Sequence, residues 1–529
     1  MPKPLLTRFT LLLSLLLPLA GVATELYRYV DDKGVTVLSR QGVPPEFIAK
    51  GYEVLNDQGR VLRVIPPAPT AEEFARMQAD KARASSDAQL LRLYTSLEDV
   101  DRARELARTM VSLGSDATLL AHGWVGTMGE RFGALIEGVR QQTDGFKQLD
   151  GGRGDDTGYR LNDLMAKLRW VSAPDAARFQ QLDFKISHTT QDSDETYLGL
   201  TDADFDATPF RRYAASALDN IQTTHDLYEL RHTIELSDRA DLTTVAYRTE
   251  FQRNWFKLND VQGVSISSIL ADPATYADQY AWISGEDSPA NALRLRNNNR
   301  SYYAQGIQSV LGIGFATGEA SHDLEIGLRV HRDQEDRYQN DDRFQMLGGE
   351  LVMTTDGAPG TQDNRVGDAE ALALYVQDTI EWGNWILSPG VRYEQIDLTR
   401  TNYSTATGQR DVVLSRVETD VDAVIPGIGA TYLVGDNLAV FASVHRGFNP
   451  PGPGSNAEPE ESVNTEFGLR YGRDALSAEL VGFVNDYSNL VGTCTASTGG
   501  NCTIGDQYDG GKARVMGLEA SLGHVFDLG

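Results

Sequence analysis

From about residue 109 to the end of the chain, apolar and polar side chains alternate along segments of roughly ten residues. Between residues 324 and 331, leucine, isoleucine and valine occupy the even positions, and glutamate, glycine, arginine and histidine occupy the odd ones. Residues 164–170, 182–187 and 385–394 show the same pattern. Because successive side chains of a strand point to opposite faces, these segments predict β-strands with one apolar and one polar face. Membrane-barrel strands fit this pattern, and so do the strands of a soluble antiparallel sandwich.

The lengths of the connections separate these two folds. Short turns follow one another at 129–131, 173–175, 237–239, 317–319, 381–383, 435–437 and 472–474, and long polar loops, such as 146–158, 259–299 and 338–367, lie between them. Outer-membrane barrels have short periplasmic turns and long extracellular loops, whereas a sandwich has no reason to place every long loop at one end. We therefore predict a mainly β protein with an antiparallel transmembrane β-barrel over residues 109–529.

The first 23 residues have the features of a secretory signal peptide. Lys3 and Arg8 precede an apolar run from Leu11 to Leu19, and small residues follow at 20–23. A membrane anchor, the alternative, needs about 20 apolar residues, which is longer than this run. We expect the chain to be exported and located in the outer membrane.

Residues 24–69 predict a small periplasmic β domain. Apolar segments at 26–30 and 35–38 flank a turn at 31–34, and a second pair at 52–55 and 61–65 flanks a turn at 56–59. The proline-rich segment 66–69 ends this unit, and residues 70–108 have the charge distribution of a helical linker. Together they predict a small α+β domain that resembles a periplasmic domain of unknown function.

The charge and the cysteines narrow the function further. A net charge of −27 argues against a nucleic-acid partner, which would require basic patches. Cys494 and Cys502, the two cysteines, lie in one polar loop. In an oxidising compartment we expect a local disulfide between them, with two free thiols as the alternative.

Several segments of the barrel region resemble TonB-dependent outer-membrane receptors of the ferric-citrate or siderophore type. They are Gly129–Gly138, Thr143–Lys147, Glu195–Phe205, His445–Gly454, Glu460–Tyr471 and Gly517–Glu519. The resemblance covers residues 109–529 and implies a 22-stranded barrel that takes up ferric chelates. It also implies a plug and a TonB-contacting box, neither of which is visible. TonB as a partner is therefore doubtful, and about 15–16 strands are recognisable, which predicts an incomplete barrel.

Anionic ferric chelates need basic side chains, and the planar guanidinium of arginine matches carboxylates. The loop alternation places Arg300, Arg365 and Arg446 at extracellular ends of strands, where we expect them to contact a ligand. The alternative is that they are rim or lumen arginines paired with nearby Asp and Glu.

No other chemistry is indicated. The eight histidines have no metal-ligand spacing, no nucleophile and base can be paired, and no cofactor motif is present. We expect a protein that is not an enzyme, embedded in outer-membrane lipid, that receives ferric citrate or a siderophore. The alternatives are a passive or inactive plugless barrel, and a receptor for another nutrient such as a carbohydrate.

Overall fold

A computed structural model describes residues 26–30, 36–39, 52–55 and 61–65, and residues 107–525 except 152–156, 174, 195, 474 and 495–506. The chain divides into two units, residues 1–94 and 95–529. The first unit contains a four-stranded sheet of β1 (Leu26–Val30), β2 (Thr36–Ser39), β3 (Tyr52–Leu55) and β4 (Val61–Ile65), in the order β2-β1-β3-β4. Both predicted hairpins are therefore present.

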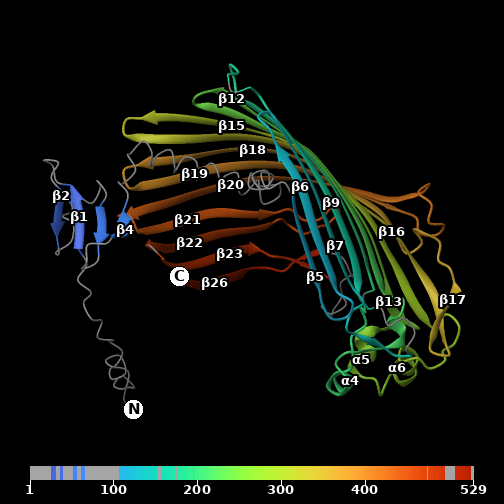
Figure 1. Cartoon of the computed structure of the whole chain (residues 1–529). Helices are drawn as coiled ribbons and strands as arrows, with labels where there is room; N and C mark the ends of the chain where they lie inside the picture. The colour runs from blue at the N-terminus through green and yellow to red at the C-terminus, as the bar shows by residue number, and fades with distance from the viewer. Residues whose placement is uncertain are drawn as a thin grey trace, which may run out of the picture. The chain divides into compact units, whose positions relative to one another are not determined.

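The second unit is an antiparallel barrel whose strands follow one another around the wall in chain order (Figure 1). Its order includes two short strands, β14 (Val264–Ser265) and β17 (Glu350–Thr355). The other sixteen are β5 (Ala107–Leu113), β6 (Leu119–Met128), β7 (Phe132–Thr143), β9 (Tyr159–Val171), β10 (Gln180–Ser193), β12 (Asn220–Ser237), β13 (Ala240–Val261), β15 (Leu293–Thr317), β16 (Ala320–Leu347), β18 (Asp363–Trp382), β19 (Trp385–Tyr403), β20 (Val413–Val434), β21 (Leu438–Asn449), β22 (Glu460–Arg473), β23 (Leu476–Asn489) and β26 (Ala513–His524).

The strand order closes between β26 and β5. The predicted number of strands is confirmed. Every other two consecutive long strands are paired residue by residue, but among the described residues no cross-strand pair joins β5 and β26, so the wall returns on itself in strand order without a paired seam. The side chains at this junction are the most exposed of the wall: Leu113 is 82% and Leu522 is 77% exposed. The side chains of β5 and β26 are exposed on both faces. Along most of β20, on another part of the wall, exposed side chains alternate with less exposed ones.

The outer face of the barrel carries an apolar band with a sharp upper edge. Ile307, Val330 and Leu372 are paired across β15, β16 and β18, and they are 57%, 57% and 41% exposed. The next outward positions toward the long loops, Gln305, Arg332 and Glu370, are all polar, and they are also paired across these strands. At the other end of the band, Trp382 and Trp385 are exposed beside a short turn, as interfacial aromatic residues are. This band is the surface that hydrocarbon would cover.

Several strands continue far beyond the band. A tilted strand crosses a bilayer in about 9–11 residues, but β15 has 25 residues and β16 has 28. The predicted loops 259–299 and 338–367 are therefore shorter than expected, since strands occupy both of their ends. Cross-strand pairing continues into these segments, so their polar composition did not mark the ends of the strands.

Consecutive extracellular loops form a compact lobe at one end of the barrel (Figure 1). It contains α4 (Asp202–Ala207), the 3-10 turn η2 (Ala214–Ser216), α5 (Ile266–Ala271), α6 (Ala277–Ile283) and the paired short strands β8 (Gln148–Leu149) and β11 (Arg211–Arg212). The 3-10 turn η2 and the helices α5 and α6 pack with the extended ends of β13, β15 and β16 around a core of Leu198, Tyr213, Ala214, Ala215, Leu258, Val261, Ile269, Ile283, Ala292, Leu293, Leu295, Phe344 and Met346. The long strands thus supply one side of a core that the loops complete.

Asp204 and Arg211 together join three of these loops. The carboxylate of Asp204 accepts hydrogen bonds of 2.6 Å from the hydroxyls of Tyr213 and Tyr280, and it pairs with Arg211 at 2.6 Å. Arg211 also pairs with Asp150 of the neighbouring loop at 2.9 Å. Burial alone would raise the pKa of Asp204, but these hydroxyls, Thr201 and the charge of Arg211 hold that pKa below its ordinary value. The ionised carboxylate therefore stabilises the lobe at neutral pH.

Asp219, just before β12, has the opposite environment. Its side chain is buried and accepts hydrogen bonds from the backbone N–H groups of Tyr197 and Leu258, at 3.1 and 3.0 Å. Burial raises the pKa of Asp219 to about 7, because the backbone N–H groups offset only part of the loss of hydration. The lobe therefore contains one carboxyl group that favours the ionised state and one that favours the neutral state.

Other predictions fall partly or wholly outside the described residues. The signal peptide lies outside them, as does all of the predicted helical linker except residues 107 and 108, which belong to β5. Cys494 is buried and disulfide-bonded, and Cys502 lies outside the described residues. Among the described residues, no helix is long and apolar enough to cross a membrane.

Replacing Gly327 with alanine is expected to destabilise the barrel. A Cβ at Gly327 would lie 1.9 Å from Cε1 of Tyr375, whose ring covers this glycine from the neighbouring strand. Overpacking of this kind costs about 1–3 kcal/mol, measurable as a lower urea midpoint in lipid vesicles. Gly472→Ala is the matched control, since its Cβ would meet nothing within 4 Å. Equal midpoints for the two variants would contradict the packing role of Tyr375.

The order of the extracellular lobe is expected to decrease as pH rises toward neutrality. The pKa of Asp219 in the folded protein, about 7, lies above the value of about 3.9 for an unfolded aspartate. Its contribution to stability is therefore complete below the unfolded pKa and is lost as pH rises through the folded pKa. Hydrogen exchange of residues 257–295, compared between the unmodified protein and Asp219→Asn at each pH, measures this loss. The variant should lack the loosening that the unmodified protein shows as pH rises from about 4 to about 7, and identical pH profiles would contradict the assignment.

Candidate functional site

Four arginines stand side by side on neighbouring strands. Arg253 of β13 is paired with Arg300 of β15, Arg300 with Arg337 of β16, and Arg337 with Arg365 of β18. We call this set the arginine row. Because residues paired across a sheet share one face, the four side chains leave the wall in the same direction. At about 4.8 Å per strand, the row spans about 14 Å of the wall.

The arginine row faces the interior of the barrel. On β16 the exposed apolar residues Leu328 and Val330 occupy even positions, so the odd position of Arg337 lies on the opposite face. On β18 the exposed Leu374 and Val376 are likewise even, and Arg365 is odd. All four arginines lie beyond the upper edge of the apolar band, toward the long loops. The row is therefore part of the lining of the extracellular mouth.

Two carboxylates lie among the four guanidinium groups. Glu335 pairs with Arg300 at 3.0 Å and with Arg337 at 2.9 Å. Asp363 lies 3.5 Å from Arg365 and 4.0 Å from Arg337. Arg253 has no ion pair with any residue that the structure describes. The row is therefore partly neutralised and retains an excess of positive charge.

This arrangement is unfavourable without a ligand. Like charges placed directly opposite each other on neighbouring strands destabilise a sheet, and here three successive pairs are like-charged. Glu335 and Asp363 relieve part of the repulsion. An anion bound across the row would relieve more, because guanidinium groups bind carboxylates with two parallel hydrogen bonds. The row thus has the chemistry of an anion-binding surface.

More cations and an aromatic pair extend the row toward the extracellular lobe. Lys257 and Arg296 are paired across β13 and β15, four residues from Arg253 and Arg300 respectively, and so lie on the same face. The ammonium of Lys257 lies 3.3 Å from the ring centroid of Tyr197 and 3.7 Å from that of Trp255. The two rings meet edge to face at 5.1 Å. This end of the site combines positive charge with aromatic surface.

An apolar patch lies on the interior face beyond the other end of the row. Ile396, Leu398 and Val421, on β19 and β20, are buried and pack with Phe448, Ala369 and Ala371. Their outward neighbours Tyr393 and Val424 are exposed, so the buried set faces inward. The mouth therefore offers arginines between aromatic and aliphatic surfaces, which suits an anion with an apolar body.

The structure brings together two of the three arginines predicted from the sequence. Arg300 and Arg365 both belong to the row. Arg446 does not. It lies an even number of residues from Val440 and Val444, which are 45% and 40% exposed, so it shares their outer face of β21, where it pairs with Glu461. Arg446 lies near the end of its strand, and its ion pair with Glu461 matches the alternative of a rim arginine paired with a carboxylate.

Arg253 and Arg337 were missed, although the sequence contains a signal for one of them. Arg300 and Arg337 lie equally far from the short turn that joins β15 and β16, so they must be cross-strand neighbours in a regular hairpin. Arg253 could not be found in this way, because the long loop between β13 and β15 leaves their register open. Among the described residues, no group of three or more His, Cys, Asp or Glu side chains is arranged to hold a metal ion.

Comparison of the sequence with known proteins gives a family and distant relatives. The family model described as "TonB dependent receptor-like, beta-barrel" matches residues 173–529. The ferric enterobactin receptor of Pseudomonas aeruginosa is 24% identical over 250 residues, which cover 42% of this chain and 32% of the relative. The ferrienterobactin receptor of Escherichia coli K12 is 26% identical over 186 residues, which cover 32% of this chain and 24% of the relative.

Solved structures show the same fold at low sequence identity. The unliganded ferric citrate transporter FecA aligns with a TM-score of 0.56 and 20% identity, over 78% of this chain and 54% of FecA. The siderophore receptor PiuA from Acinetobacter baumannii aligns with a TM-score of 0.61 and 14% identity, over 80% of this chain and 62% of PiuA. The chain spans about a third or less of the curated relatives and just over half of these structures. With the family model matched over most of its length, the chain belongs to the TonB-dependent receptor β-barrel family.

Proposed function

We propose that this chain binds an anionic iron chelate at the arginine row and admits it through the outer membrane as the barrel of a receptor. The observation that carries the proposal is the alignment of Arg253, Arg300, Arg337 and Arg365 on one interior face. The similar proteins, two receptors for ferric enterobactin and a transporter of ferric citrate, support the same class of ligand.

The chemistry of the mouth supports a chelate better than a simple anion. Ferric carboxylate and catecholate complexes present several negatively charged oxygens around one metal, and a row of guanidinium groups can contact more than one of them. Tyr197 and Trp255 at one end offer ring surface on which a catechol can stack. Ile396 and Leu398 at the other end offer aliphatic contact.

Removing two of the four charges of the row is expected to weaken chelate binding. Each charge-assisted hydrogen bond contributes about 1.5–3 kcal/mol, so Arg300→Gln with Arg365→Gln should reduce affinity by about 100-fold or more. Ferric citrate and a ferric catecholate are titrated against the purified chain in detergent. Arg446→Gln is the matched control, because Arg446 lies on the outer face. Affinity that falls equally in the control, or in neither variant, would exclude the row as the site.

Arg253→Gln separates a ligand-binding role from a structural one. Arg253 makes no described ion pair and faces Arg300, so its replacement removes repulsion and is expected to leave the unfolding midpoint unchanged or to raise it. Chelate affinity should fall in the same variant. A lower midpoint with unchanged affinity would show that Arg253 serves the fold instead.

Transport is tested separately from binding. Cells starved of iron that express the chain should accumulate labelled ferric citrate only when TonB is present, if the chain works as a gated receptor. Accumulation that is the same without TonB would support a passive pore. Binding without accumulation would confine the proposal to the recognition step.

A further inference from the structure

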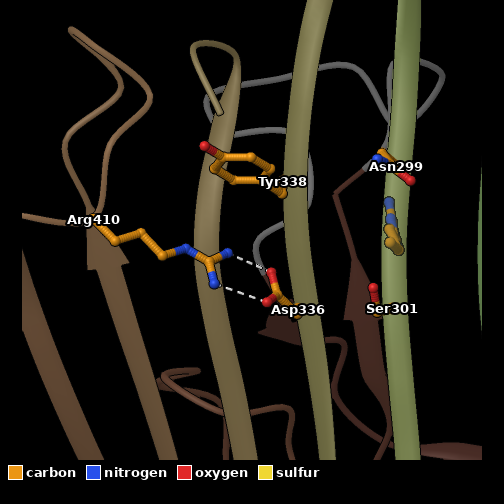
Figure 2. A pocket seen from close by; sticks show the side chains of 6 residues that line it. Asn299, Ser301, Asp336, Tyr338 and Arg410 are labelled. Atoms are coloured by element: carbon orange, nitrogen blue, oxygen red, sulfur yellow. Dashed lines mark hydrogen bonds and ion pairs between the residues drawn. The ribbon is translucent and has the colours of Figure 1, made fainter. Parts of the chain in front are cut away.

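A small polar pocket lies on the outer wall of the barrel, on the opposite face from the arginine row. It has a volume of about 250 Å³ and is lined by Asn299, Arg300, Ser301, Asp336, Tyr338 and Arg410. Asn299 and Ser301 flank Arg300 on β15, so their side chains point outward where that of Arg300 points inward. Figure 2 shows Asp336 and Tyr338 on the neighbouring strand and Arg410 reaching toward them from a third segment. The pocket therefore opens on the opposite face from the proposed chelate site, although Arg300 of β15 belongs to the arginine row and also lines the pocket.

The loop between β19 and β20 builds one side of the pocket. The hydroxyl of Tyr338 donates to the carbonyl of Gly408 at 2.9 Å, and the side-chain amide of Asn364 donates to the same carbonyl at 3.2 Å. Arg410 donates from Nε to Asn364 at 2.9 Å and from Nη1 to Asp336 at 2.8 Å, and its Nη2 also donates to Asp336. The loop is thus fixed against β16 and β18 in the absence of a ligand.

The charged side chains on the outer face of the pocket, Asp336 and Arg410, compensate each other, whereas the side chain of Arg300 points inward and pairs with Glu335. This compensation disfavours a free phosphate or a cation as the ligand. Arg410 uses three of its five N–H donors in these bonds, and each oxygen of Asp336 retains a lone pair. Asn299 and Ser301 are both exposed and add an amide and a hydroxyl. Such a set matches a neutral molecule with several hydroxyl groups.

Tyr338 adds a flat surface to this set. Its ring lies beneath the guanidinium of Arg410, with 5.0 Å from Cζ to the ring centroid. Aromatic rings bury large apolar area while their hydroxyl remains bonded. The C–H face of a pyranose is apolar and its rim is hydroxylated, so it fits an aromatic ring next to paired donors and acceptors. The volume is below the roughly 300–1,000 Å³ of pockets for drug-sized ligands, which suits one sugar unit.

The height of the pocket limits where such a sugar comes from. Asp336 lies six residues beyond Val330, the last apolar residue of the outer band on β16. At about 3.3 Å per residue and a tilt of about 35–45°, this is about 14–16 Å above the band. Phospholipid head groups occupy only about 5–8 Å on each side of the hydrocarbon. A lipid-borne ligand at this height must therefore have a long, saccharide head group.

We propose that this outer-wall pocket binds a neutral hexose unit carried by a glycolipid of the outer leaflet. Binding there would hold one glycolipid against β15 and β16 without involving the lumen. A free sugar has the same chemistry as the sugar of a glycolipid. Because the proposed sugar is carried by a lipid, its membrane anchor should raise the occupancy of the pocket.

The test uses the full chain reconstituted in vesicles. Three probes are compared: lipopolysaccharide with a hexose-containing core, lipopolysaccharide without core sugars, and the free core oligosaccharide. Retention of each probe by the purified protein is measured by native mass spectrometry. The proposal expects retention of the first probe at least about tenfold above the second, with weaker binding of the third.

Asn299→Ala with Ser301→Ala removes two exposed pocket groups without touching the bonds that hold the loop. This double variant should lose most of the preference for the hexose-containing core. Gln252→Ala is the control, because Gln252 is exposed on the same face and is paired with Ser301, but does not line the pocket. Equal retention of both lipopolysaccharides, or the same loss in the control, would overturn the proposal. Tight binding of the free oligosaccharide alone would overturn the lipid-borne source.

Discussion

The constraint on which this structure depends is that hydrocarbon offers no hydrogen-bonding partner to a peptide group. Each strand within the apolar band must therefore satisfy its N–H and C=O groups on neighbouring strands, and pairing in chain order does this with short turns. Register follows from these turns. Once β15 and β16 are joined at 317–320, the position of every outward and inward side chain along both strands is fixed. The apolar band, the arginine row and the outer-wall pocket are three consequences of that register.

Beyond the band, the same pairing serves a different purpose. The extended ends of β13, β15 and β16 no longer face lipid on their outer side, and they supply buried residues such as Leu258, Leu295 and Phe344 to the extracellular lobe. Ionic and tyrosine contacts at Asp204 then connect loops that are far apart in the sequence. The loops are folded as one body on an extension of the barrel wall, which gives the mouth a fixed outline on that side.

The sequence was informative wherever a local pattern determines the outcome. Alternation and turn spacing predicted the strands, their approximate number and both hairpins of the first unit. They predicted Arg300 and Arg365 as residues at the mouth. They failed where the outcome depends on long-range register: polar residues at 294–300 and 332–342 resemble a loop but continue the strands, because their partners across the sheet are equally polar. The outward direction of Arg446 was not predicted either, because it follows from the positions of Val440 and Val444 along the strand and not from the nearest loop.

The dependence of the arginine row on register has a consequence for how such a barrel can change over generations. Point substitutions alter one contact at a time, and the long loops can gain or lose residues without moving the wall. Insertion or deletion of a single codon within the hairpin formed by β15 and β16 is different. It would exchange inward and outward faces on one side of the change, which would turn arginines of the row away from the mouth or, within the band, place Arg329 against lipid and Leu328 toward the interior. Genetic variation in length should therefore be confined to the extracellular loops, while recognition diversifies by substitution on a wall of constant length.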